Sequence, residues 1–312
     1  MATNVLLTID VELMWRADVA RHGWQAIFER SYDPAGVGIP YQLRKLAEHD
    51  LHACFFVDPM PGLHFGVEPV KRMVGPILEA GQDVQLHLHP QWAGMADETF
   101  VDAFEMNAYS KAEQRAMMER ACELLMKAGA PAPIAFRAGS YSANDATLRA
   151  AASLGIRYDS SHDGSAHPWP SAISLPADQI LPIEHEGVVE LPVTLIGAIS
   201  GYRHLQICAV SLAEMRAALR HAVDDDHPLV TIVSHSFELA TRNGERVNRA
   251  HLRRFEGLCA HLQQHSADMP TRRVADLGRL PIGHLAEPMP SDPIRALGRQ
   301  AEQLWSNFYE ER

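Results

Sequence analysis

The sequence has few cysteines, and none of them lie close together. Its four cysteines, Cys54, Cys122, Cys208 and Cys259, are spread along 312 residues and form no CxxC pair. Small disulfide scaffolds are dense in cysteine, and cysteine zinc sites use closely spaced pairs. The spacing therefore argues against both.

The sequence also lacks a long apolar segment and an excess of basic residues. No apolar run approaches the roughly 20 residues that cross a bilayer. The start, MATNVLLTIDVELMW, shows no basic region, no long apolar stretch and no cleavage site. The formal net charge of −11 disfavours a nucleic-acid partner. We expect a cytoplasmic protein with no membrane span and no nucleic-acid ligand.

No glycine-rich phosphate loop or fixed-period repeat is present, but apolar strand-like runs alternate with helical patterns about seven times. This alternation predicts an α/β fold with a parallel sheet, either closed into a barrel or doubly wound. The predicted strands cover 4–10, 52–59, 83–88, 134–139, 157–161, 187–193 and 228–236. The predicted helices cover 40–50, 69–81, 110–130, 144–156, 211–224 and 248–266.

We expect residues 1–285 to form one catalytic domain and residues 286–312 a C-terminal helical extension. The apolar residues of this extension, which could pack on the body or on another subunit of a homo-oligomer, are Leu297, Leu304, Trp305 and Phe308. Two long segments, 90–109 and 160–181, interrupt the alternation. In parallel α/β folds such loops build the walls of sites at the carboxyl ends of strands.

Reactive side chains recur at the ends of the predicted strands. They are Asp10, Glu12, His87, His89, Arg137 and His235. In a parallel barrel these strand ends converge on one mouth, so the side chains are expected to lie near one another.

The first two pairs indicate a metal site. Asp10 and Glu12 are two residues apart, and carboxylates on one face repel each other unless a cation or a shared proton intervenes. His87 and His89 likewise share a face, and two imidazoles with one carboxylate are a usual set of three zinc ligands. The alternatives are a strand that has already ended, with solvated carboxylates, and a hydrogen-bonded histidine pair.

Three further residues have both a functional and a structural interpretation. Arg137 could anchor a catalytic carboxylate or form a structural salt bridge. His235 is placed like a general acid or base, although a histidine bonded within the core is the alternative. Trp92 could cover a sugar face or pack in the core.

In order and spacing, several short motifs resemble those of the NodB-type polysaccharide deacetylases, carbohydrate esterase family four. These motifs are LLTIDVE, DVQLHLHPQW, FRAGSYSAN with LGIRYDSS, VVELPVT and TIVSHSFEL. The resemblance covers roughly residues 4–278. It implies a distorted (β/α)7 barrel and a divalent metal, with zinc as the first expectation, that activates water to remove an N-acetyl group from an amino sugar.

The resemblance also implies roles for individual residues. Asp10 matches the general base, Arg137 the arginine that orients it, and His235 the general acid. Tyr141 matches the residue whose backbone N–H holds the oxyanion, and Ser140 and Trp92 are further candidates for substrate binding.

The ligand set departs from the family pattern. Glu12 and His87 match metal ligands, but the second histidine of the family stands four residues after the first, where this chain has Gln91. His89, Gln91 or water would therefore complete the site, and we take His89 as the candidate.

The expected function is hydrolysis of an N-acetylated sugar, such as a cytoplasmic precursor of a surface polysaccharide or lipopolysaccharide. The alternatives are hydrolysis of another C–N amide bond, as in allantoinase, and a degenerate sugar-binding protein without catalysis.

Overall fold

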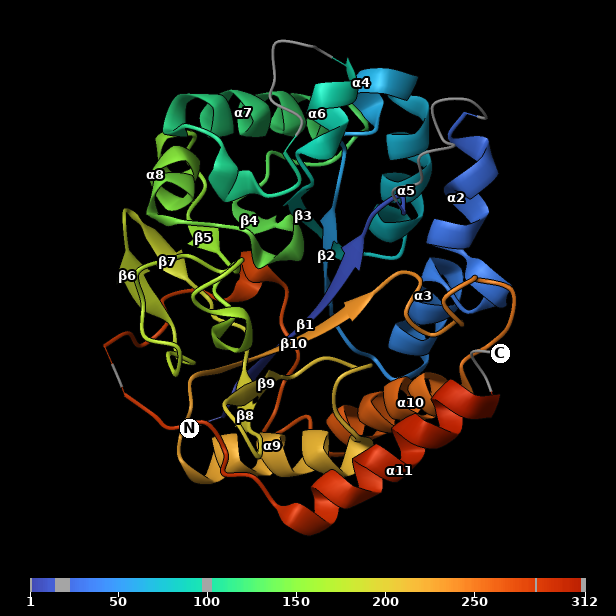
Figure 1. Ribbon diagram of the computed structural model, residues 1–312, viewed down its shortest axis with the longest axis vertical. Coiled ribbons are helices and arrows are strands. Elements are labelled where there is room, and N and C mark those ends of the chain that lie inside the picture. Colours follow the sequence, from blue (N-terminus) through green and yellow to red (C-terminus); the bar gives the residue numbers. More distant parts are fainter. Residues whose placement is uncertain (1, 15–22, 97–102, 284, 310–312) are drawn as a thin grey trace.

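The computed structural model describes residues 2–14, 23–96, 103–283 and 285–309. Within these ranges a curled sheet lies at the centre and helices surround it (Figure 1). Seven of its strands run parallel in the order β10-β1-β2-β3-β4-β5-β7. Their bounds are β1 Asn4–Val11, β2 Cys54–Val57, β3 Asp83–Leu88, β4 Ala135–Ala138, β5 Tyr158–Asp159, β7 Val188–Glu190 and β10 Leu229–His235.

Short antiparallel strands extend this sheet and form a second one. β6 (Ile183–His185) pairs antiparallel with β7 at the end of the sheet, and β8 (Leu195–Gly197) pairs with β9 (Tyr202–His204). The described helices are α2 Gln25–Tyr32, α3 Ile39–Glu48, α4 Gly62–Phe65, α5 Glu68–Glu79, α6 Gln91–Ala96, α7 Lys111–Lys127, α8 Asp145–Ser153, α9 Leu212–Asp224, α10 Arg249–Gln264 and α11 Pro293–Tyr309. None of them combines the length and apolar character that a membrane crossing requires.

Local sequence signals set the starts of three helices. Ser110, Asn144 and Ser211 each accept a hydrogen bond from the backbone N–H three residues later, and the side chain at that later position bonds back to the cap. Such capping boxes satisfy N–H groups that have no partner inside the helix. The helix predicted over 110–130 begins at one of these caps, Ser110.

The two faces of β1 have different surroundings. Val5, Leu7 and Ile9 pack in the large core cluster. Leu6 belongs to a second cluster with Phe56 and Leu229, which lie on neighbouring strands. Because side chains alternate along a strand, Asp10 lies on the same face as Leu6, two rungs nearer the carboxyl end. The candidate site therefore lies next to this second apolar cluster, toward the carboxyl ends of the strands.

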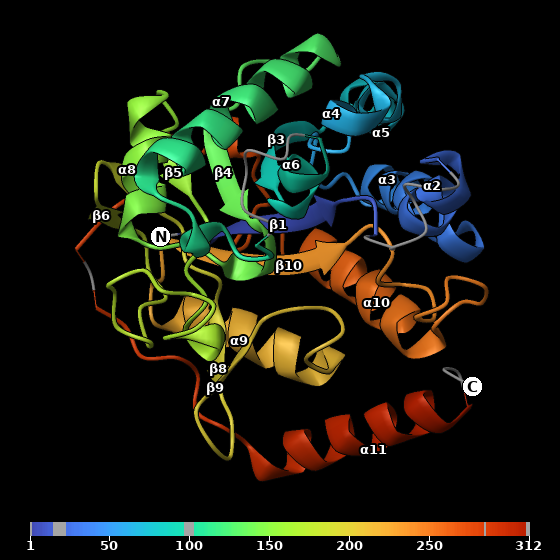
Figure 2. The same ribbon diagram turned by 45° about the horizontal axis from the view of Figure 1, so that its top comes forward.

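The C-terminal helix α11 runs along the outside of α9 and α10 (Figures 1 and 2). Its contacts with the body include polar ones: Glu302 pairs with Arg254 of α10, and Arg299 pairs with Glu214 of α9. The four apolar residues predicted to pack are not buried: Leu297, Leu304, Trp305 and Phe308 are 66%, 69%, 41% and 56% exposed. Packing of these residues against another subunit stays a prediction.

Candidate metal centre and active site

The carboxyl ends of the central strands bring the predicted residues together. Asp10 stands beside His235 of β10, and His87 of β3 stands beside Arg137 of β4. An Nη1 of Arg137 donates a 2.7 Å hydrogen bond to Oδ1 of Asp10, and Nε2 of His235 lies 3.9 Å from Oδ2 of Asp10. The expected convergence of strand ends is therefore what the structure shows.

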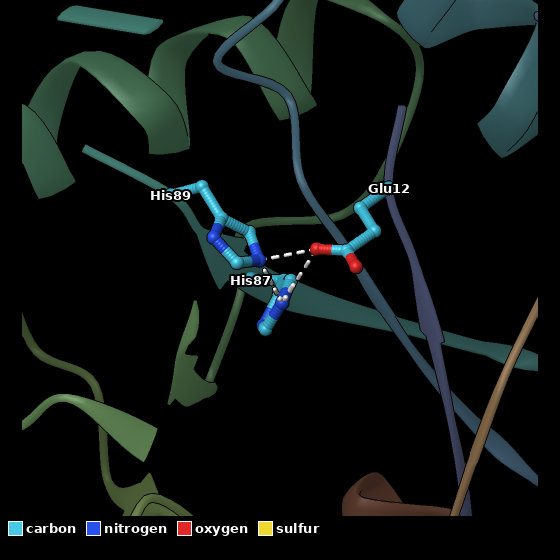
Figure 3. Close-up of side chains that lie close together, drawn as sticks. All are labelled: Glu12, His87 and His89. Atoms are coloured by element: carbon cyan, nitrogen blue, oxygen red, sulfur yellow. Dashed lines mark hydrogen bonds and ion pairs between the residues drawn. The ribbon is translucent and has the colours of Figure 1, made fainter. Parts of the chain in front are cut away.

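Glu12, His87 and His89 form a compact group of possible ligands (Figure 3). Oε2 of Glu12 lies 3.6 Å from Nε2 of His87 and forms a closer ion pair with Nε2 of His89. The two Nε2 atoms are 3.2 Å apart. Nδ1 of His87 lies 2.9 Å from the carbonyl oxygen of Arg137. Because a carbonyl oxygen can only accept, Nδ1 carries the proton and donates it, which leaves the Nε2 lone pair facing the group.

Charge interactions within this group are strong. Burial would raise the pKa of Glu12, but the charge of His89 and the hydrogen bond that His89 donates hold it well below its usual value. Burial would lower the pKa of His89, but Glu12 raises it to about 9. In the absence of a cation, a proton on His89 thus balances the buried carboxylate. Two imidazole nitrogens and one carboxylate converging on one point fit a zinc-type ion, which would replace that proton.

Gly139, which follows β4, allows the ring of His89 to take its place. A Cβ atom at Gly139 would lie 2.4 Å from Nδ1 of His89, so no larger residue fits without moving the ring. The next two residues, Ser140 and Tyr141, have φ angles of 53° and 57°. Such left-handed conformations are costly for residues other than glycine and often occur at functional sites.

Arg137 is fully buried, and its guanidinium group makes several hydrogen bonds. It donates to Asp10, Thr8 and Ser160, and its guanidinium lies 4.4 Å from the centroid of the Phe56 ring. A buried guanidinium with this many partners has one orientation, and it fixes Asp10 as well. The geometry favours the anchoring interpretation of Arg137.

His235 is oriented from the other side by two residues that the sequence did not indicate. Nε2 of Gln206 lies 3.2 Å from Nδ1 of His235 and donates to Oε1 of Glu238 at 2.6 Å. Because the amide N–H₂ group donates, Nδ1 of His235 accepts, and the imidazole proton sits on Nε2, toward Asp10. Gln206 follows a short hairpin strand, and no sequence rule connects it with β10.

Asp58 is a further residue that sequence reasoning missed. Val57 pairs with Val11 on one side and Leu86 on the other, so Asp58, one residue on, stands between Glu12 and His87. Its Oδ1 accepts from the N–H of Met60, and its buried Oδ2 has no hydrogen-bond partner among the described residues. Burial raises the pKa of Asp58 to about 6. Asp58 directly follows the strand CFFV, so a search for polar residues at strand ends could have found it.

The candidate substrate-binding residues have different surroundings. Trp92 is completely buried in α6 and meets the ring of Phe65 edge-on, at 6.0 Å between centroids. Ser140 is exposed, and Tyr141 is half-buried with its ring 6.2 Å from that of His204. Gln91 is buried at the start of α6, and its Oε1 has no hydrogen-bond partner among the described residues. His89 is thus the residue that meets Glu12 and His87, and Trp92 is part of the core.

Comparison with known proteins identifies the class of fold. No protein-family model matches the chain, and no curated protein matches it in sequence. A Mycobacterium smegmatis protein provisionally described as a polysaccharide deacetylase is similar in structure, with a TM-score of 0.58 and 21% identity, over 92% of this chain and 94% of that one. The chain therefore has the distorted (β/α)7 barrel of the polysaccharide deacetylase type, as predicted.

Two more distant structures were also found. A family 4 carbohydrate esterase from Streptomyces lividans in complex with acetate has a TM-score of 0.45 and 13% identity, over 93% of this chain and 98% of that one. A pseudoenzyme of the same family from Bacillus anthracis has a TM-score of 0.46 and 13% identity, over 93% of this chain and 70% of that one.

Proposed function

We propose that the protein is a metal-dependent hydrolase that removes an N-acetyl group from an amino sugar. The observation that carries this proposal is the meeting of two sets of residues at one sheet edge. Glu12, His87 and His89 offer a metal site, and Asp10 lies between Arg137 and His235 as an acid–base pair requires.

The residues supply the functions that amide hydrolysis needs. A divalent cation held by Glu12, His87 and His89, which we expect to be zinc, would lower the pKa of water and polarise the amide carbonyl. Asp10, kept in place by Arg137, accepts a proton from the attacking water. His235 gives its Nε2 proton to the departing nitrogen and takes up the proton that Asp10 removed from the water, and the C–N bond breaks to give acetate and a free amine. The resemblance assigns the oxyanion to the backbone N–H of Tyr141.

Two measurements on the purified chain test this proposal. Metal content by mass spectrometry is expected to be near one zinc, nickel or cobalt per chain, and to be lost in Glu12→Ala and His89→Ala. His64→Ala, which removes an exposed histidine of α4, serves as the matched control. Absence of bound metal after growth and dialysis with each of these ions would contradict the metal site.

The second measurement is acetate release from a panel of N-acetyl sugars. Asp10→Asn keeps the shape of the side chain but cannot accept the proton, so we expect a loss of about a thousandfold with metal content unchanged. Release of product from allantoin in place of N-acetyl sugars would favour the other amide hydrolase, and binding of sugars without release would favour a degenerate site.

A further inference from the structure

A cavity of about 650 Å³ opens beside His235. Its walls come from the segment that follows β9, from the loop that follows β10, and from α11. Figure 2 shows β9 and α11 on the β10 side of the sheet. Ligand sites of small molecules commonly have volumes of about 300–1,000 Å³, so this space can hold more than the acetyl group.

The charged residues that line this cavity are mainly arginines. Four arginines and one carboxylate line it: Arg30, Arg203, Arg242, Arg299 and Glu238. Glu238 already accepts hydrogen bonds from Gln206 and from the backbone N–H groups of Cys208 and His235. In a chain with a net charge of −11, this cavity is a local concentration of positive charge.

Two of these arginines, Arg203 and Arg299, lie close enough for their charges to interact. Arg299 uses its Nε to pair with Glu214 at 3.2 Å. Arg203 makes no ion pair with any carboxylate of the described residues, and its Nη1 donates a 3.5 Å hydrogen bond to the carbonyl of Ala209. Burial and the charge of Arg299 lower the pKa of Arg203. Two guanidinium groups that repel each other in a half-buried wall are stabilised by an anion between them.

The rest of the wall is polar and supplies further hydrogen-bonding groups. Arg299, Gln303 and Asn307 lie four residues apart, on one face of α11, and all three line the cavity. His251 is 9% exposed; its Nδ1 lies 2.8 Å from the carbonyl of Glu238, so its Nε2 is an acceptor, without a partner among the described residues. Such an acceptor suits a hydroxyl group.

We propose that the cavity beside His235 is a subsite for a phosphate group of the substrate, with Arg203 and Arg299 as its binding residues. The substrate is then a sugar phosphate or a phosphate-linked sugar, and its amide reaches Asp10 and His235 while its phosphate lies against α11. This placement of the amide rests on the proposed function; the affinity for phosphate does not.

Calorimetric titration of the full chain with glucose and glucose 1-phosphate tests the subsite. Neither compound contains an amide, so binding is measured without hydrolysis. We expect glucose 1-phosphate to bind at least about tenfold more tightly than glucose, because charge-assisted hydrogen bonds to guanidinium groups are strong. Salt should weaken this preference.

Variants locate the effect. Arg203→Met should lower the affinity for glucose 1-phosphate about tenfold, and Arg203→Lys should retain part of it because the charge remains. Arg216→Met, which removes an exposed arginine of α9, should change nothing. Titrations with uridine diphosphate glucose and with farnesyl phosphate show whether a nucleotide or a lipid carries the phosphate; binding of either that depends on Arg203 supports the subsite.

Equal affinities for glucose and glucose 1-phosphate in the unmodified chain would overturn the proposal, and this comparison requires no variant to fold. A preference for phosphate that survives intact in Arg203→Met would overturn it as well. Phosphate binding without acetate release would contradict only the proposed hydrolysis. Acetate release without a preference for phosphate would contradict only the subsite.

Discussion

Gly139 determines whether His89 can reach Glu12. The His89 ring lies against Gly139, on the side where a side chain would begin. A Cβ atom at Gly139 would lie 2.4 Å from Nδ1 of His89. Its φ angle is not in the left-handed region, so alanine is compatible with the backbone and only the contact with the ring matters. The change Gly139→Ala therefore moves His89 without removing any ligand atom.

We expect Gly139→Ala to lower zinc affinity by about tenfold or more, as displaced ligands and their supporting groups generally do. Competition with a coloured chelator measures this. Gly75→Ala is the control: no atom lies within 4 Å of the added Cβ in helix α5, so zinc affinity should stay the same and the helix should gain about 0.5–1 kcal/mol. Unchanged zinc affinity in Gly139→Ala would remove His89 from the ligand set.

At the residue scale, the sequence predicts the positions of site residues that lie at the ends of regular strands. Asp10, His87, Arg137 and His235 meet because parallel strands end at one edge, and alternation along the strand brings Glu12 and His89 to the same face. Residues in irregular segments have no such rule. Gln206 is an example, and its contact with His235 depends on how the segment after β9 folds back.

At the scale of elements, Arg254 of α10 connects α11 with the segment that holds Gln206. Its side chain is almost completely buried; Nε and Nη2 donate to Oε2 of Glu302, and Nη1 donates to the carbonyls of Ile207 and Cys208. The sequence predicted an amphipathic tail helix, but a hydrophobic pattern does not reveal ion pairs. In the structure, polar links of this kind attach α11 to the body.

Replacing Arg254 with leucine should therefore be costly. It leaves a partly buried carboxylate and two carbonyls without donors, and we expect a loss of about 3 kcal/mol in the free energy of unfolding. Chemical denaturation measures this, and hydrogen exchange should increase in α11 and in residues 205–208. Arg115→Leu is the control, because Arg115 and Glu119 form an exposed pair on α7 worth about 0.5 kcal/mol or less. Equal losses in the two variants would contradict the role of Arg254.

At the scale of the whole molecule, the alternation of strands and helices predicted a parallel sheet but left a closed barrel and a doubly wound sheet as alternatives. The structure has seven parallel strands in the described residues, and antiparallel β6 ends the sheet beyond β7. β6 follows the segment 160–181. The composition of this segment does not reveal the path that it takes. His162 in this segment links it to the sheet: its backbone N–H donates to the Glu190 carboxylate of β7, and its ring Nε2 lies 3.0 Å from the carbonyl of Pro176.

His162 should make the stability of the whole chain depend on pH. It is fully buried, and burial lowers its pKa to about 4, whereas an unfolded chain has a histidine pKa of about 6.5. Between these values the unfolded state binds the extra proton, so the stabilising effect present above pH 6.5 is lost as pH falls toward 4. From pH 7 to pH 5 this amounts to about 2 kcal/mol.

His162→Gln keeps an N–H donor for Pro176 but cannot titrate. Urea denaturation at pH 7 and pH 5 should therefore show a loss of stability that is smaller by about 2 kcal/mol in His162→Gln than in the unmodified chain. His64→Gln, at an exposed position of α4, is the matched control and should show the same loss as the unmodified chain. If His162→Gln loses as much stability as the unmodified chain, His162 is not the group that carries the acid sensitivity of the fold.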